Sequence, residues 1–159
     1  MKTLILGLGN PILSDDSVGF HVVQALVGRF DEQEVTVMES DLGGLSLLDL
    51  LLGYDRVIIV DSIQTVKGKI GQIYRLKPED FVIPRHTGSP HDVSLIATLE
   101  LGKRLGLEMP KEIVIFAIEV QDVINFGEKC TPEVEQVIPK VVAMVASELK
   151  GGEKPRTEE

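Results

Sequence analysis

Three short apolar runs constrain the fold of this chain more than any other feature. They occupy residues 4–6, 57–60 and 113–118. Each run is too short for a helix and has no polar alternation, a pattern typical of parallel strands that are covered on both faces. The first run leads through a turn to Asp16, the second ends at Asp61 and the third at Glu119. We therefore expect a parallel sheet with acidic groups along its carboxyl edge.

Segments with helical spacing of apolar residues alternate with these strands. They begin near residues 14, 45, 90 and 132, and Ser14 or Asp15 is the expected N-cap of the first. We expect Pro139 to kink the last helix. Residues 34–39 and 71–76 are expected to add two strands, the second as an antiparallel edge strand. The pattern predicts a three-layer α/β/α sandwich, with a twisted, mostly parallel sheet and helices on both faces.

Composition narrows the class of protein. The 159 residues, 43% of them apolar, predict a single domain over residues 1–150 and a polar, disordered tail at 151–159. A net charge of −9 argues against nucleic-acid binding, and no apolar run reaches the ~20 residues that cross a membrane. The single cysteine, Cys130, cannot form an internal disulfide, and the chain opens on a strand instead of a signal peptide. We therefore expect a cytoplasmic protein, and we expect a monomer because no additional apolar stripe is present.

Asp16, Asp61 and His91 form the main candidate site. The two aspartates follow strands whose carboxyl ends share one edge of the sheet, where open α/β folds bind ligands. His91 lies in the first turn of a helix that Ser89 is expected to cap, a position that disfavours the charged imidazolium. Two carboxylates and one neutral imidazole suit a divalent cation that keeps an open coordination position.

Each of these residues also has an ordinary structural interpretation. Asp16 could complement a helix dipole, Asp61 could cap a turn, and His91 could be a capping or surface residue. Spacing along the sequence does not establish that the three side chains converge. The shared edge of the sheet is the argument that joins them.

Five further residues are weaker candidates. His21 lies within a helix and His86 in a loop, and no motif fixes either one. Cys130 has no evident base, which argues against a nucleophilic role. Asp15 is expected to point away from Asp16 and to act as a cap, and Glu119 is expected at the rim of the site.

Several motifs, in order along nearly the whole chain, resemble the hydrogenase maturation endopeptidases. They are Gly-Leu-Gly-Asn-Pro-Ile-Leu-Ser-Asp-Asp at residues 7–16 with Gly19, the strand ending in Asp61, the Ser89-Pro90-His91 helix start, and the run from 118–119 to 131–135. This family trims the C-terminal tail from the large subunit of nickel–iron hydrogenases. The resemblance implies the same activity here, on a twisted sheet with helices on both faces.

The resemblance also implies roles for particular residues. Asp16, Asp61 and His91 correspond to metal-contacting residues, and the family recognises nickel that is already inserted in the precursor. Cleavage then follows a basic or histidine residue just beyond the final cysteine motif of the substrate. Gly43 and Gly44 match a loop that helps to dock the substrate, although a leucine separates them from the usual aspartate. The protein alone would hold at most an adventitious divalent cation.

Two mechanisms and two other functions remain open at this stage. Hydrolysis could be metal-assisted, with a carboxylate as proton acceptor, or Asp16 and Asp61 could share one proton in a metal-free aspartic mechanism. A nickel-dependent module could dock on the large subunit without cutting it. Peptidyl-tRNA hydrolases also open with a Gly-Leu-Gly-Asn-Pro turn, but they continue with a tyrosine and an Arg-His-Asn stretch where Ser14-Asp15-Asp16 stands here.

Overall fold

The computed structural model describes residues 1–41, 45–82 and 90–151, and for residues 45, 81, 82, 90–94 and 151 it describes the backbone alone. Five strands form one sheet in the order β2-β1-β3-β5-β4. The strands are β1 (Thr3–Leu8), β2 (Val35–Ser40), β3 (Arg56–Ile63), β4 (Ile73–Leu76) and β5 (Glu112–Glu119). The first four in spatial order are parallel, and β4 pairs antiparallel with β5. The predicted mostly parallel sheet with an antiparallel edge strand is confirmed.

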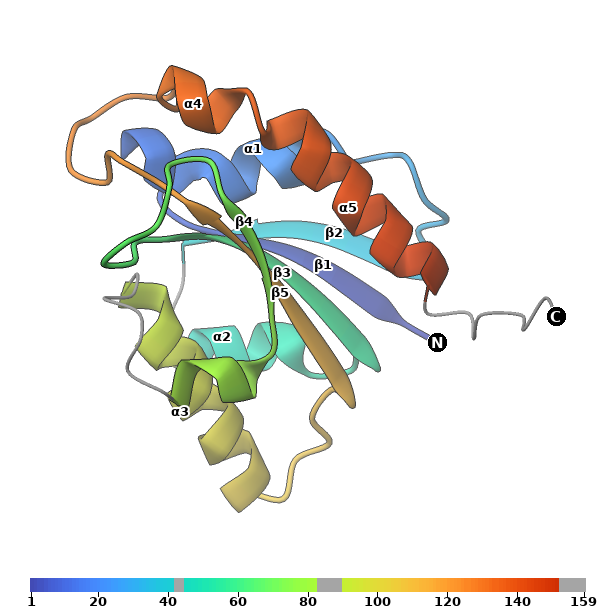
Figure 1. Cartoon of the computed structure of the whole chain (residues 1–159). Helices are drawn as coiled ribbons and strands as arrows, with labels where there is room; N and C mark the ends of the chain where they lie inside the picture. The colour runs from blue at the N-terminus through green and yellow to red at the C-terminus, as the bar shows by residue number, and fades with distance from the viewer. Residues whose placement is uncertain (42–44, 83–89, 152–159) are drawn as a thin grey trace, which may run out of the picture.

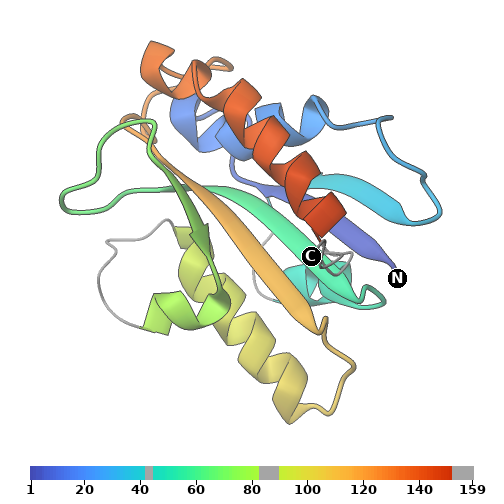
Figure 2. The ribbon, with the colours of Figure 1, turned by 45° about the vertical axis from the view of Figure 1, so that its right-hand side comes forward.

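Helices cover both faces of this sheet (Figures 1 and 2). On one face lie α1 (Val18–Gln24), α4 (Pro132–Glu135) and α5 (Ile138–Gly151), and on the other lie α2 (Leu45–Leu51) and α3 (Pro90–Arg104). Two short 3-10 helices, η1 (Ser14–Ser17) and η2 (Pro78–Val82), lie in the connections. The three-layer α/β/α architecture is therefore confirmed.

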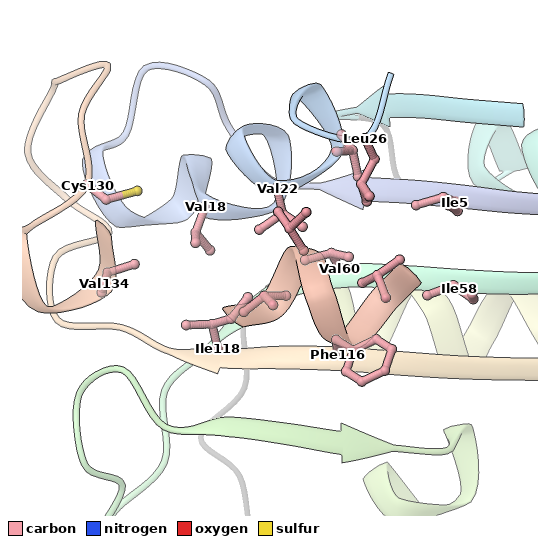
Figure 3. Close-up of a cluster of buried hydrophobic side chains, with 14 of the residues drawn as sticks. Ile5, Val18, Val22, Leu26, Ile58, Val60, Phe116, Ile118, Cys130 and Val134 are labelled. Atoms are coloured by element: carbon pink, nitrogen blue, oxygen red, sulfur yellow. The ribbon is translucent and has the colours of Figure 1, made fainter. Parts of the chain in front are cut away.

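Two apolar clusters, one on each face, explain why the strands read as continuous apolar runs. Ile58 and Val60 of β3 belong to the cluster under α1 and α5, which Figure 3 shows. Ile59 and Ile63 of the same strand belong to the cluster under α2 and α3. Successive side chains of a strand point to opposite faces, so both sets must be apolar when both faces are covered.

The start of the first helix differs from the sequence prediction. Residues 14–17 form the 3-10 helix η1, and α1 begins only at Val18, with no side-chain cap at its N-terminus. Ser14 has a positive φ of 34°, and its hydroxyl donates to the carbonyl of Lys129. Asp15 binds a distant segment as well. The expected N-cap by Ser14 or Asp15 is therefore wrong, because both side chains are engaged with residues that follow β5.

The final helical segment also differs, since it is two helices instead of one kinked helix. The break lies between Glu135 and Ile138. Pro139 is the second residue of α5, where its missing N–H costs no hydrogen bond because the first turn of a helix has no acceptors for its donors. Among the described helices, none is both long and apolar enough to span a membrane.

Several expectations concern residues outside the described part of the chain. They are the docking glycines Gly43 and Gly44, His86, the Ser89 cap and residues 152–159 of the expected tail. Gly151, which was assigned to that tail, is the last residue of α5. The division into one domain and a tail stays a prediction.

Candidate active site

The carboxyl edge of the sheet gathers the residues of the main candidate site. Asp16 lies in η1, which follows β1, and Asp61 lies near the end of β3. Helix α3 begins at this same edge, so the backbone of His91 is placed there too (Figures 1 and 2). The structure therefore places the backbone of all three residues at one edge of the sheet.

Glycine at position 9 allows η1 to close onto the end of β1. Gly9 has a φ of +152°, and a Cβ atom there would collide with the carbonyl oxygen of Asp16. The Asp16 N–H donates to the carbonyl of Leu13 at 2.8 Å, and the Asn10 N–H donates to the carbonyl of Asp16 at 3.3 Å. These contacts hold Asp16 in a tight turn directly above the strand, where only a residue without a side chain fits opposite it.

Ser62 contacts both candidate aspartates. Its hydroxyl donates to Asp16 Oδ1 at 2.7 Å, and its backbone N–H donates to Asp61 Oδ1 at 2.8 Å. Asp16, Asp61 and Ser62 are 7%, 3% and 1% exposed. One buried residue therefore orients both carboxylates, a role not predicted from the sequence. The available signal was a hydroxyl residue directly after Asp61.

The extension of β3 explains this arrangement. The strand continues two residues beyond its expected end at Asp61, since Ser62 and Ile63 pair with Ile118 and Glu119 of β5. Alternation along the strand places Asp61 on the face of α2 and α3, as for Ile59 and Ile63. Ser62 faces the layer of α1 and η1, from which Asp16 reaches it.

The contacts of Ser62 do not test whether Asp16, Asp61 and His91 together form a metal site. Among the described residues, no three His, Cys, Asp or Glu side chains group as a metal site. The His91 side chain is outside that set, because only the backbone is described at this position. Asp16 and Asp61 supply two buried carboxylates that both accept a hydrogen bond from Ser62, and the contribution of His91 stays a prediction.

Asp15 has a role quite different from that of its neighbour. Its carboxylate is fully buried and accepts four hydrogen bonds: from the N–H groups of Gln121, Asp122 and Thr131, and from the Thr131 hydroxyl. The expectation that it points away from Asp16 is confirmed. Instead of capping its own helix, however, it fixes the connection between β5 and α4 to the turn that carries Asp16.

Glu119 is also an anchor and not an open rim residue. It is 2% exposed, and its carboxylate accepts hydrogen bonds from the N–H of Thr65 at 2.9 Å and from the Thr65 hydroxyl. The Tyr74 hydroxyl donates to it at 3.4 Å. Glu119 therefore holds the connection between β3 and β4, and the rim assignment from the sequence is wrong.

Cys130 and His21 are structural residues, as their sequence context favoured. Cys130 lies in the apolar cluster near Val18 and Val134 (Figure 3), and burial raises the pKa of its thiol to about 11. A thiol with this pKa is protonated at neutral pH and is a poor nucleophile. His21 Nε2 lies 2.8 Å from the carbonyl of Glu128, to which it donates, and so ties α1 to the segment before α4.

Comparisons with known proteins agree with this architecture. The model of the HycI hydrogenase maturation protease family matches residues 20–148. Hydrogenase 2 maturation protease of Escherichia coli strain K12 is 28% identical over 152 residues, covering 94% of this chain and 92% of the relative. The solved structure of the hydrogenase maturating endopeptidase HybD from E. coli superposes with a TM-score of 0.80 at 27% identity, covering 96% of this chain and 94% of that one.

A second solved structure is also similar to this chain. HybD, a [NiFe] hydrogenase maturation protease from Thermococcus kodakarensis, is 26% identical, with a TM-score of 0.70 and coverage of 94% of this chain and 99% of that one. The family model spans most of the sequence, from α1 through α5, and includes Asp61 and His91. The chain therefore belongs to the hydrogenase maturation protease family.

Proposed function

We propose that this protein is an endopeptidase that removes the C-terminal extension from the nickel-loaded precursor of a nickel–iron hydrogenase large subunit and thereby activates the hydrogenase. The observation that carries the proposal is the pair of buried aspartates, Asp16 and Asp61, held by Ser62 at the carboxyl edge of the sheet. Family membership supplies the class of reaction and the class of substrate.

In this proposal Asp16, Asp61 and His91 contact nickel, which arrives as part of the substrate. Two carboxylates bring two negative charges, which match a divalent cation, and carboxylate oxygen with imidazole nitrogen is a donor set that suits nickel. Binding of the metal would bring the adjoining peptide to the site. Substrate without nickel would lack this attachment, so the protease would act only after the metal has been inserted.

For the chemical step we propose metal-assisted hydrolysis. Nickel would supply Lewis acidity, and one of the two aspartates would accept a proton from the attacking water. The metal-free alternative, in which Asp16 and Asp61 share one proton, does not need nickel for the bond cleavage itself. Gly43 and Gly44 as docking residues, action as a monomer and a cytoplasmic location remain predictions from the sequence.

Intact mass measurement of the precursor tests this function. Nickel-loaded and nickel-free precursors are incubated separately with the wild-type protein and with Asp16→Asn. Asp49→Asn, an exposed position on α2, is the matched control. The proposal predicts loss of the tail only from the nickel-loaded precursor, with the wild type and with the control.

Two other outcomes would contradict the proposal. Stable binding of the nickel-loaded precursor by the wild type without any new C-terminus would identify a docking module. Equal cleavage of nickel-free precursor would remove nickel from both recognition and chemistry, and would favour the metal-free aspartic mechanism.

A further inference from the structure

The segment between β5 and α4 carries two unusually exposed apolar side chains. Ile124 is 80% exposed and Phe126 is 83% exposed, and among the other described large apolar residues only Met1, at 80%, and Val66, at 75%, are comparably exposed. Ile12, in the turn before η1, is 51% exposed. Large apolar side chains this exposed, gathered at one place, are typical of an interaction site.

Backbone pairing places two of these residues side by side. Leu13 forms a parallel bridge with Gly127, in which the Gly127 N–H donates to the carbonyl of Ile12 at 2.8 Å and the Ser14 N–H donates to the carbonyl of Gly127 at 2.9 Å. Ile12 and Phe126 each precede a bridge partner, so they are lateral neighbours across this pairing. Ile124 lies two residues before Phe126 in the same segment. We call Ile12, Ile124 and Phe126 the apolar rim.

The backbone beneath the apolar rim is held in a fixed position. Asp15 accepts from both ends of the segment, at Gln121, Asp122 and Thr131. Asp122 in turn accepts from the N–H groups of Ile124 at 3.1 Å and Asn125 at 3.0 Å. Exposure of the rim is therefore a feature of an ordered segment. A surface whose backbone is already ordered loses little conformational entropy when a partner binds.

The apolar rim is continuous with the candidate active site. Ile12 is four residues before Asp16, in the turn that the Leu13 N–H closes by donating to the carbonyl of Asn10, and the Asp16 N–H donates in turn to the carbonyl of Leu13. The Asp15 N–H also donates to the carbonyl of Asp122, at 2.8 Å, so both parts of the rim are joined to η1. Since Asp16 is 7% exposed, a protein substrate that reaches its carboxylate must lie against the surface beside it.

We propose that the apolar rim is the docking surface for an apolar patch of the protein substrate, next to the peptide that is cut. The inference rests on the proposed function, because it names the part of this chain that holds the same substrate. Asp122 and Glu128 flank the rim, and the chain carries a net charge of −9. A complementary patch would therefore be apolar at its centre with basic residues at its margin.

Binding and steady-state kinetics with rim variants test the proposal. Ile124→Ser and Phe126→Ser are made in the otherwise wild-type protein, with Val27→Ser, which is 64% exposed and follows α1, as the matched control. Each rim variant should raise KM for the nickel-loaded precursor about tenfold with kcat little changed, as expected when a central apolar contact is removed. Val27→Ser should leave both parameters unchanged, and none of the three should alter the circular dichroism spectrum.

The outcomes separate this inference from the proposed function. Unchanged KM in both rim variants, with a wild type that cleaves, would overturn the docking surface and leave the protease intact. If the wild type does not cleave, the proposed function fails, and the dissociation constant for the precursor still tests the rim through the same about tenfold change. A wild-type dimer that Phe126→Ser converts to a monomer would assign the rim to a second copy of the chain and would also overturn the proposal.

Discussion

The replacement Asp15→Asn should destabilise the protein strongly although it keeps the number of non-hydrogen atoms. The carboxylate is fully buried and accepts hydrogen bonds at distances of 2.6 to 3.0 Å from three N–H groups and one hydroxyl. The amide keeps one acceptor oxygen, so its NH2 group must face either the Thr131 N–H or the donors of Gln121 and Asp122. Loss of charge assistance on the remaining bonds and one buried donor without an acceptor together cost about 3 kcal/mol.

Urea unfolding followed by circular dichroism measures this cost. A loss of about 3 kcal/mol is a large part of the 5–15 kcal/mol typical of a whole domain. Asp49→Asn, at an exposed position of α2, is the control and should change the free energy of unfolding by less than about 0.5 kcal/mol. Hydrogen exchange should also rise at residues 121–131 in Asp15→Asn. A loss below about 1 kcal/mol, with unchanged exchange there, would refute the anchoring role that we derive from these four bonds.

Three further predictions concern Ser62, Cys130 and Glu148. Ser62→Ala removes the hydrogen bond that orients Asp16 and should lower kcat for the nickel-loaded precursor about tenfold, measured from initial rates, with KM little changed. Because burial raises the pKa of Cys130 to about 11, iodoacetamide at pH 8 should alkylate the urea-unfolded protein and leave the native protein largely unmodified, as read by mass. Hydrogen bonds from Arg75 lower the pKa of Glu148, so its stabilisation is present above the unfolded pKa and is lost as pH falls through the folded value. Glu148→Gln should therefore be less stable than the wild type by about 1 kcal/mol at pH 7, and the difference should vanish in acid unfolding measurements.

The strands, and the edge of the sheet that carries the candidate site, could be predicted from the sequence because strands buried on both faces have continuous apolar sequences. A parallel strand between two helical layers must be apolar at every position, and its end shows as the first charged residue. This rule put Asp61 in the last part of β3, but the strand end was two residues too early, because β5 supplies pairing partners for Ser62 and Ile63.

What the sequence could not reveal depends on residues that are far apart along the chain. Asp15 and Thr131 are 116 positions apart, and nothing local to either residue indicates that they meet. The expected cap at Ser14 was wrong for the same reason, since its hydroxyl binds Lys129. A helix cap is predicted from the residue type and its immediate neighbours in the sequence. Here hydrogen bonds to distant residues determine the side-chain positions instead.

Cleavage by the Asp16 and Asp61 pair is the central claim, and the masses of both products test it most directly. With the nickel-loaded precursor, the wild type should yield one short C-terminal peptide and one shortened large subunit whose masses sum to that of the precursor plus one water. Asp61→Asn should yield neither product while it retains the wild-type circular dichroism spectrum. Release of the same peptide by Asp61→Asn at the wild-type rate would contradict the account.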